Sequence, residues 1–413
     1  MDRVLPAAPA VKSSVAGQRE PVVEQYLLLG LRLGRLIDGY LDSWYGDPAL
    51  ARQVADEPAA VPTELVRQAT VLLAALPESG LPEARRQFLA VQVQALRCTA
   101  AKLAGDSIGF RAEVEQYFDV SIVPSELAEY QALHDELAEL LPGSGTLRRR
   151  LVDYRQRARL DGDLLGRAVN TVSEALRARL AVELDLPKQE RVDYHVVHDR
   201  PWNAFNSYLG GFRSRVTVNA DAGHWLSGLA IVVAHEAYPG HHAERCLKER
   251  ELVRERGWQE HTIALVNTPQ CLVSEGAAEL ALAVLGEGWG AWLATVLHPL
   301  GLRLNGPEAE RVDRIMWRLT ELRQDAALML HDRHIDPDEV MAFLSRWLLV
   351  DDRAAGQMLR FLLDPLWRAY IATYVEGRRL VGRWLNGRPA DQPIAVRYRQ
   401  LLSQQWLPAM LRA

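Results

Sequence analysis

The sequence has few cysteines, no excess of either charge and no long uninterrupted apolar run. Its three cysteines, Cys98, Cys246 and Cys271, are far apart among 413 residues, which excludes the disulfide framework of small secreted domains. Acidic and basic residues are interspersed and give a net charge of −5. This pattern offers no basic surface for nucleic acid and no polybasic segment for an anionic membrane.

Apolar segments of the kind that cross or enter a membrane are also missing from the sequence. The most apolar stretch, residues 280–302, is interrupted by Glu287 and Pro299, so buried core helices are favoured over a membrane span. The first 20 residues are rich in alanine and proline and lack the apolar centre of a signal peptide. We therefore predict a cytoplasmic protein without a nucleic-acid or membrane partner; the sequence does not indicate its oligomeric state.

Most of the sequence shows apolar residues at helical spacing. Between residues 191 and 219 the pattern changes, and β-branched residues cluster at 192–197 and 214–219 as they do in strands. We expect residues 202–211 to form a loop between these strands, and the chain to return to helix through Trp406. Apolar residues recur with helical spacing at 22–45, 64–76, 83–104, 110–118, 125–141 and 147–184.

These patterns predict a mainly α, multi-helix fold with a small β-sheet before the histidine-bearing helix. We divide the chain into a flexible N-terminus at 1–20, a helical region at 21–188 and a region with the sheet and the histidines at 189–413. A hydrophobic content of 48% is enough for a substantial core. We expect the last two regions to pack as one unit.

Three of the eleven histidines lie within eight residues, in the segment His-Glu-Ala-Tyr-Pro-Gly-His-His that begins at His235. In the familiar His-Glu-x-x-His zinc motif, the two imidazoles are four residues apart on one helix face. Here that position is Pro239. On an undisturbed helix His241 would lie about 120° around the axis from His235, and His242 roughly 10 Å further along it.

Pro239 itself indicates how the imidazoles can meet. Proline removes one helical hydrogen bond and clashes with the preceding turn, and it pushes the residue before it out of the helical region. Gly240 then gives the backbone freedom to enter a new helix. We predict a helix that breaks just after Glu236 and absorbs two residues, so that His241 is the second metal ligand and His242 is the second choice.

A third ligand is expected from a later helix, and the best candidate is Glu275. A carboxylate that faces the inside of an alanine- and leucine-rich helix is unfavourable unless it pairs with a cation or a metal. Glu279, four residues on, is expected to orient a ligand imidazole. Cys246 is interpreted as a buried neutral thiol.

These segments resemble a bacterial family known as domain of unknown function 885, whose members are usually described as zinc metallopeptidases. A further Tyr-x-x-Gly pattern of that family is similar to residues 374–377, and the resemblance extends from about Asp193 to Leu380. It implies a metallopeptidase-like fold. The family signatures His-Glu-x-x-Pro-Gly-His and Glu-Gly-x-Ala match His235, Glu236, Pro239, Gly240, His241, Glu275, Gly276 and Ala278.

The chain also departs from the family pattern close to the expected ligands. After Glu275 and Gly276 the family usually carries Trp-Ala-Leu-Tyr-Ala-Glu, whereas this chain has Ala-Ala-Glu-Leu-Ala-Leu at 277–282. A glutamine that is common after the histidine pair is Glu244 here. A pocket without that tryptophan and tyrosine is expected to take a different substrate.

The sequence thus predicts a zinc-dependent hydrolase that cleaves a peptide or small amide substrate. One Zn²⁺ would be held by His235, His241 and Glu275, with a position left open for water. Glu236 would act as the general base. Tyr374 is the candidate donor to the oxyanion.

Several alternatives stay open at this point. Tyr370 and Tyr238 are rival oxyanion donors, and the small sheet either offers an edge strand to a peptide or only caps the helices. The protein could be a biosynthetic amidase for a specialised conjugate, or a non-catalytic helical protein whose zinc is structural or absent. A structural zinc would take His242 or Cys246 as a fourth ligand. Candidate clamps for a substrate carboxylate are Arg213, Arg314 and Arg360.

Overall fold

The structure is a computed structural model that describes residues 20–160, 162–199 and 203–412. The predicted flexible N-terminus lies outside the described residues except for Glu20. The chain is mainly helical with small β-sheets, as its apolar periodicity predicts. No helix in these described ranges is both long and apolar enough to span a lipid bilayer.

The elements follow one another in two helical series with the larger sheet between them. The first helices and strand are α1 (Pro21–Leu36), β1 (Leu41–Trp44), α2 (Pro48–Asp56), α3 (Pro62–Ala75), α4 (Glu83–Leu103), α5 (Phe110–Phe118), α6 (Leu127–Leu140), α7 (Leu147–Arg157) and α8 (Asp163–Leu184). The sheet strands are β2 (Arg191–Val197), β3 (Ala204–Gly210) and β4 (Arg213–Asn219).

The later elements begin with the short helical turn η1 (Ala220–Ala222), and many of them are short. They continue with α9 (Leu226–Glu236), α10 (His241–Lys248), η2 (Glu249–Arg254), η3 (Gln259–Thr262), β5 (Ile263–Leu265), α11 (Pro269–Glu279), η4 (Leu282–Leu285), α12 (Trp289–Leu297), η5 (His298–Leu300), α13 (Gly306–Leu319), α14 (Leu322–His331), α15 (Pro337–Trp347), α16 (Asp352–Leu363), η6 (Thr373–Gly377), α17 (Arg378–Asn386), α18 (Ile394–Ser403) and α19 (Pro408–Leu411).

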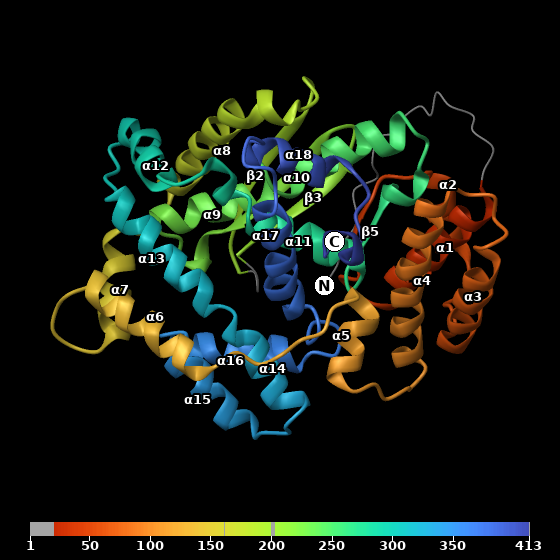
Figure 1. Cartoon of the computed structure of the whole chain (residues 1–413), viewed down its shortest axis with the longest axis horizontal. Coiled ribbons are helices and arrows are strands. Elements are labelled where there is room, and N and C mark those ends of the chain that lie inside the picture. Colours follow the sequence, from red (N-terminus) through yellow and green to blue (C-terminus); the bar gives the residue numbers. More distant parts are fainter. Residues whose placement is uncertain (1–19, 161, 200–202, 413) are drawn as a thin grey trace.

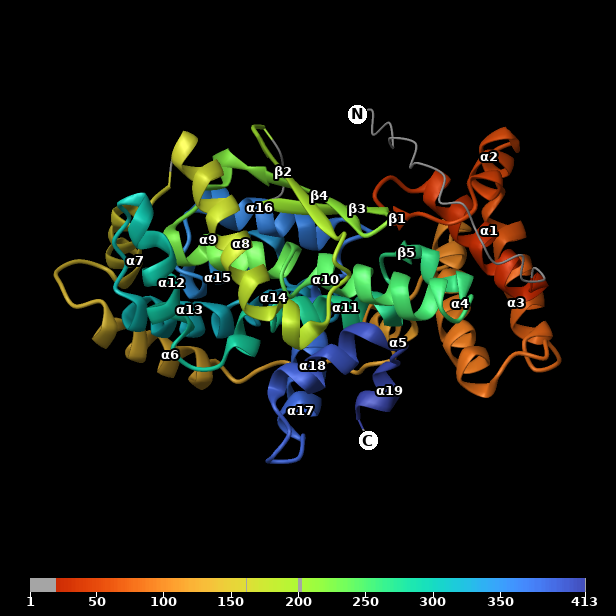
Figure 2. The same cartoon turned by 90° about the horizontal axis from the view of Figure 1, so that it is seen from above.

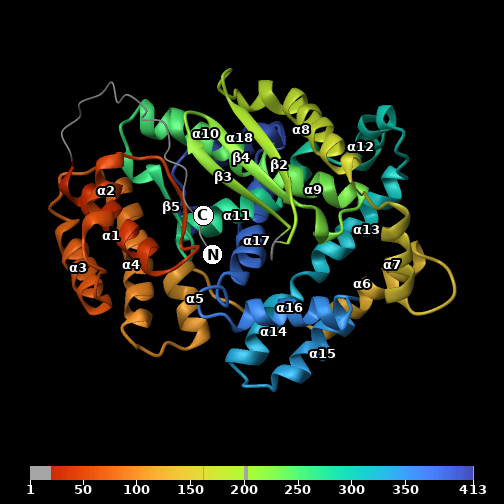
Figure 3. The same cartoon turned by 180° about the vertical axis from the view of Figure 1, so that it is seen from behind.

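Helices α9, α10 and α11 occupy the centre of the molecule (Figure 1). The three-stranded sheet lies across α9 and α10 on one side, and α17 and α18 lie on the opposite side (Figure 2). From behind, the sheet covers the central helices (Figure 3). Helices α1–α4 form one end of the molecule, and α6, α7, α12 and α13 form the other (Figure 1).

The sheet has a third strand, β3, that the sequence analysis does not predict. Strands β2 and β4 pair in parallel, and β3 pairs antiparallel with β4, so the order is β2-β4-β3 and β3 is an edge strand. The expectation of a loop at 202–211 is therefore wrong for the part that forms β3. Asparagine, serine and glycine suggested a loop, but Asn206 and Tyr208 alternate inward as strand residues do.

Two long helical segments of the prediction are also corrected. The segment 22–45 is helical only through Leu36, and β1 follows and pairs with β5. The segment 147–184 is divided between α7 and α8. In both segments apolar residues continue at helical spacing past the end of the first helix, because the elements on either side also bury apolar residues. Periodicity alone therefore does not reveal where the first helix ends.

Two large hydrophobic cores support these elements. One is built mainly by α1–α4 with Ile263 and Leu265 of β5, and the other takes in α5–α18. Helix α4 contributes to both, since Leu96 and Ala100 belong to the first core and Ala95 and Cys98 to the second. The predicted regions 21–188 and 189–413 therefore share both cores.

Candidate metal centre

The break after Glu236 brings two short helices together at an angle. Helix α9 ends at Glu236, as predicted, and α10 begins at His241. The N–H of Gly240 donates to the carbonyl of Ala234 at 2.9 Å, which ties the connecting turn to the end of α9. A Cβ atom on Gly240 would lie 1.9 Å from the carbonyl oxygen of His235. Only glycine fits this close approach.

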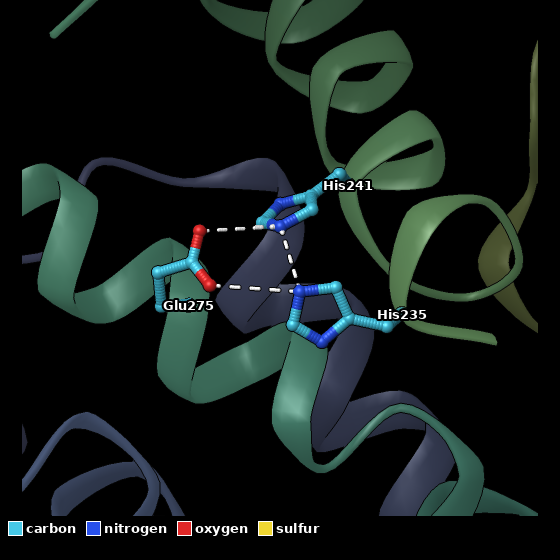
Figure 4. A group of neighbouring side chains, drawn as sticks. All are labelled: His235, His241 and Glu275. Carbon is cyan, nitrogen blue, oxygen red and sulfur yellow. Dashed lines mark hydrogen bonds and ion pairs between the residues drawn. The ribbon is translucent and has the colours of Figure 1, made fainter. Parts of the chain in front are cut away.

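The turn aims the imidazoles of His235 and His241 at the carboxylate of Glu275 (Figure 4). The two Nε2 atoms are 3.2 Å apart. Glu275 lies 3.3 Å from His241 Nε2 through Oε1 and 3.5 Å from His235 Nε2 through Oε2. The structure therefore brings together the three residues that the sequence singles out as metal ligands.

The spacing of these three side chains suits a small divalent cation. Zinc with ligand bonds of about 2.0–2.1 Å in tetrahedral geometry places its donor atoms about 3.3–3.4 Å apart. The observed separations of 3.2, 3.3 and 3.5 Å lie around that value. Glu275 Oε2 is buried without a hydrogen-bond partner among the described residues, as expected of an atom that serves a metal. The donor set fits zinc.

Neighbouring side chains hold two of the three candidate ligands, His241 and Glu275, in orientation. Ser274 Oγ lies 3.3 Å from His241 Nδ1 and donates to Glu244. Tyr370 donates its hydroxyl to Glu275 Oε1 at 2.9 Å. Such outer partners fix ring orientation and tautomer in metal sites.

The prediction that Glu279 orients a ligand has a structural counterpart. Glu279 Oε1 lies 3.6 Å from His235 Nδ1, which is an ion-pair separation and too long for a good hydrogen bond. Its other oxygen accepts from Trp317 Nε1 at 2.7 Å. Glu279 is therefore fixed by Trp317 beside the outer nitrogen of His235.

Opposite charges stabilise one another within the three-residue group. Burial by itself would lower the pKa of both imidazoles, but Glu275 and the other nearby carboxylates, Glu236 for both and Glu244 for His241, together outweigh it, so the pKa of His235 and that of His241 are raised. Burial by itself would raise the pKa of Glu275, but the two imidazoles outweigh it and lower the pKa well below its usual range. The protein alone thus favours a carboxylate surrounded by positive charge, which a bound cation also provides.

Glu236 shares a cavity with the three candidate ligands. Its side chain is half-buried, and burial raises its pKa, with the negative charges of Glu275 and Asp42 acting in the same direction. The Nδ2 of Asn206 on β3 donates to the backbone carbonyl of Glu236. The glutamate is thus anchored through its main chain, while its side chain faces the cavity.

The three candidate tyrosines have different surroundings. Tyr374 lines the cavity, and its hydroxyl has no hydrogen-bond partner among the described residues. Tyr370 also lines the cavity, but its hydroxyl is committed to Glu275. Tyr238 donates to Glu190 instead. The structure leaves Tyr374 as the tyrosine with a hydroxyl available to the cavity.

His242, the second choice for a ligand, does not reach the group. Its Nδ1 lies 2.8 Å from Ser214 Oγ and its Nε2 lies 2.8 Å from Glu190 Oε2. Cys246 Sγ lies beside His242, 3.5 Å from Nε2. Within the described ranges, the group that can hold a metal contains His235, His241 and Glu275, so neither alternative supplies a fourth protein ligand.

The three arginines proposed as carboxylate clamps lie elsewhere. Arg213, Arg314 and Arg360 are exposed, and none of them lines the cavity. Arg245 and Asp42 do line it. Arg245 follows His241 by one helical turn, which is a signal in the sequence. Asp42 carries no such signal, because β1 reaches the cavity through contacts with distant parts of the chain, among them its pairing with β5.

The comparisons with known proteins bear on the fold. The chain is similar to a protein from Colwellia psychrerythraea described as a "putative lipoprotein", with a TM-score of 0.54, 14% identity, and 85% of this chain and 68% of that chain covered. It is also similar to one from Shewanella oneidensis described as a "putative lipoprotein of unknown function", with a TM-score of 0.54, 14% identity, and 88% and 74% covered. At this identity the likeness shows the fold alone.

No protein-family model and no curated protein matches the chain. The resemblance to the domain of unknown function 885 family therefore stays a prediction that depends on the two motifs.

Proposed function

We propose that the protein is a zinc-dependent hydrolase that cleaves a peptide or amide bond. One observation carries the proposal: three metal-binding side chains converge in a cavity that also contains a half-buried glutamate. Catalytic zinc sites take three protein ligands and keep one position open, whereas structural sites take four. Among the described residues this group has three members, His235, His241 and Glu275, and this number supports a catalytic rather than a structural zinc site.

His235, His241 and Glu275 would hold the ion. Zinc supplies Lewis acidity, which lowers the pKa of a water molecule toward neutrality and polarises a carbonyl group. Glu236 accepts a proton from the attacking water and passes it to the departing amine nitrogen. Tyr374 donates its hydroxyl to the oxygen that gains negative charge. Water adds to the carbonyl carbon, the carbon–nitrogen bond breaks, and a carboxylate and an amine leave.

The edge strand β3 supports a peptide or peptide-like substrate. The N–H of Asn219 donates to the carbonyl of Asn203 at 2.9 Å, which fixes the hydrogen-bonding phase of β3 against β4. By alternation, the backbone groups of Ala204 and Asn206 point away from β4. Both residues line the cavity. An extended substrate can pair with this edge through its main chain.

The test of the proposal is the substitution Glu236→Gln, which keeps the size of the side chain and removes its basicity. General-base catalysis contributes about 100- to 10,000-fold in rate. We expect the variant to bind zinc as the wild type does and to lose turnover by that order. Zinc content is measured by elemental analysis, and hydrolysis by mass spectrometry on a panel of dipeptides, blocked peptides and amino-acid amides.

The exposed Glu255 provides the matched control as Glu255→Gln, which should hydrolyse the panel at the wild-type rate. Turnover by Glu236→Gln at that rate would show that another group is the base. Failure of the wild type to bind zinc, or to cleave any member of the panel when it is loaded, would reject the hydrolase.

A further inference from the structure

Arg245 is buried beside the candidate metal centre with most of its donors unused. The residue is 8% exposed and lines the cavity. Its Nη2 lies 3.4 Å from Oδ2 of Asp42, longer than the distance of about 2.7–2.9 Å that charged pairs adopt. Its Nε and Nη1 atoms have no hydrogen-bond partner among the described residues.

Two other arginines of the chain, unlike Arg245, form two hydrogen bonds with one carboxylate. Arg85 donates to both oxygens of Glu260 at 2.7 Å, and Arg32 donates to both oxygens of Glu57 at 2.8 and 2.7 Å. Glu244 and Asp42 stabilise the charge of Arg245 and raise its pKa, but neither forms such a two-bond pair with its guanidinium. Its planar fork of donors matches a carboxylate. Arg245 therefore has free donors with which it can bind an acidic ligand in the cavity.

The position of Arg245 relative to His241 limits where that ligand lies. The two residues are four apart on α10, so they share a helix face with Cβ atoms about 5–6 Å apart. Consecutive Cα atoms of a peptide are about 3.8 Å apart. When the scissile carbonyl of the substrate lies beside His241, the carboxylate of the substrate residue that directly follows this carbonyl lies near the guanidinium of Arg245. A longer leaving segment would extend past it.

We propose that Arg245 binds the free α-carboxylate of the amino acid that follows the scissile bond. The substrate is then a peptide or an N-acyl amino acid with a free C-terminus, and the enzyme releases its last residue. This inference depends on the proposed hydrolase function. Water adds to the acyl carbon, and the proton that Glu236 takes from water completes the amine of the released amino acid. Asp42 positions the guanidinium.

The experiment uses pairs of acetylated tripeptides that differ only at the C-terminus, where one carries a free carboxylate and the other a carboxamide. The zinc-loaded full-length protein should prefer the free acid in kcat/KM by about 10- to 100-fold, the worth of a hydrogen-bonded charged pair. Arg245→Gln should bring the ratio close to one, and Arg245→Lys should keep part of it. Because each ratio is measured within one protein, a partial loss of folded protein cancels.

The matched control is Arg250→Gln. Arg250 follows Arg245 by five residues, donates to the carbonyl of Asp185 at 2.6 Å and does not line the cavity. This variant should keep the full preference. Equal cleavage of acid and amide by the wild type, or an undiminished preference in Arg245→Gln, would overturn the inference and leave metal-dependent hydrolysis standing.

A binding measurement separates this inference from the proposed function. Calorimetry on the zinc-loaded Glu236→Gln protein compares the free acid with the amide, and repeats the comparison with Arg245→Gln added. Binding of the acid at least tenfold tighter than the amide, lost with Arg245, supports the carboxylate site even where neither peptide is hydrolysed. Equal binding of the two peptides rejects it.

Discussion

A buried carboxyl beside helix α9 makes the stability of this protein depend on pH in a calculable way. Asp313 of α13 is 5% exposed, and its Oδ2 has no hydrogen-bond partner among the described residues. Burial raises its pKa from 3.8 to about 6, although Ser227 of α9 and the charge of Arg155 oppose the shift. The folded state therefore holds this proton more tightly than the unfolded chain does.

The sign of the effect follows from proton binding. Between pH 3.8 and about 6 the folded state binds more protons at Asp313 than the unfolded state, so the free energy of unfolding falls as pH rises through this window. The stabilisation from Asp313 is fully present below pH 3.8 and is lost above about pH 6. A shift of about two pKa units corresponds to about 3 kcal/mol.

The substitution Asp313→Asn keeps the shape of the side chain and removes its titration. Denaturant unfolding of both proteins at several pH values between 4 and 8 gives the difference in the free energy of unfolding. We expect that difference to move in favour of Asn by about 2 kcal/mol from pH 4 to pH 7, because part of the stabilisation is already lost at pH 4. Taking a difference between the two proteins cancels the titration of every other group.

The exposed Asp56 serves as a control for the removal of an aspartate charge, as Asp56→Asn. A difference between wild type and Asp313→Asn that stays constant from pH 4 to pH 8 would refute the reasoning. It would mean that Asp313 has the same proton affinity in the folded protein as in the unfolded chain.

Two further substitutions test how the candidate metal centre is supported. Ser274→Ala removes the hydroxyl beside His241 Nδ1, and we expect a loss of about 10- to 100-fold in zinc affinity; unchanged affinity in a chelator competition would show that Ser274 does not orient the imidazole. Gly240→Ala places a Cβ atom 1.9 Å from the His235 carbonyl oxygen, so the turn must move; we expect a lower Tm and a lower zinc content, and wild-type values for both would contradict the close approach.

Part of the centre could be predicted because the relevant information is local. Pro239 cannot continue a helix and Gly240 tolerates close backbone contact, so the break after Glu236 follows from two adjacent residues. The unfavourable burial of an unpaired carboxylate singled out Glu275 in an apolar helix. The distances between these side chains then follow from how α9, α10 and α11 pack.

The residues that the sequence did not reveal come from distant parts of the chain. Asp42 reaches the cavity because β1 pairs with β5, more than two hundred residues later. Nothing in the composition of residues 202–211 marked β3 as an edge strand, because Asn206 and Tyr208 resemble loop residues until the sheet buries them. Arg245 could have been chosen over Arg213 only from its place one turn after His241.

The sequence by itself determined the helical class, the kinked histidine helix and the chemical types of the candidate ligands. Each of these depends on residues within one or two turns of one another, where backbone sterics and side-chain chemistry act directly. The tertiary structure alone decided that Tyr238 and His242 turn to Glu190 while Tyr370 turns to Glu275. Such choices depend on which buried polar partners the packing of separate elements brings within hydrogen-bonding distance.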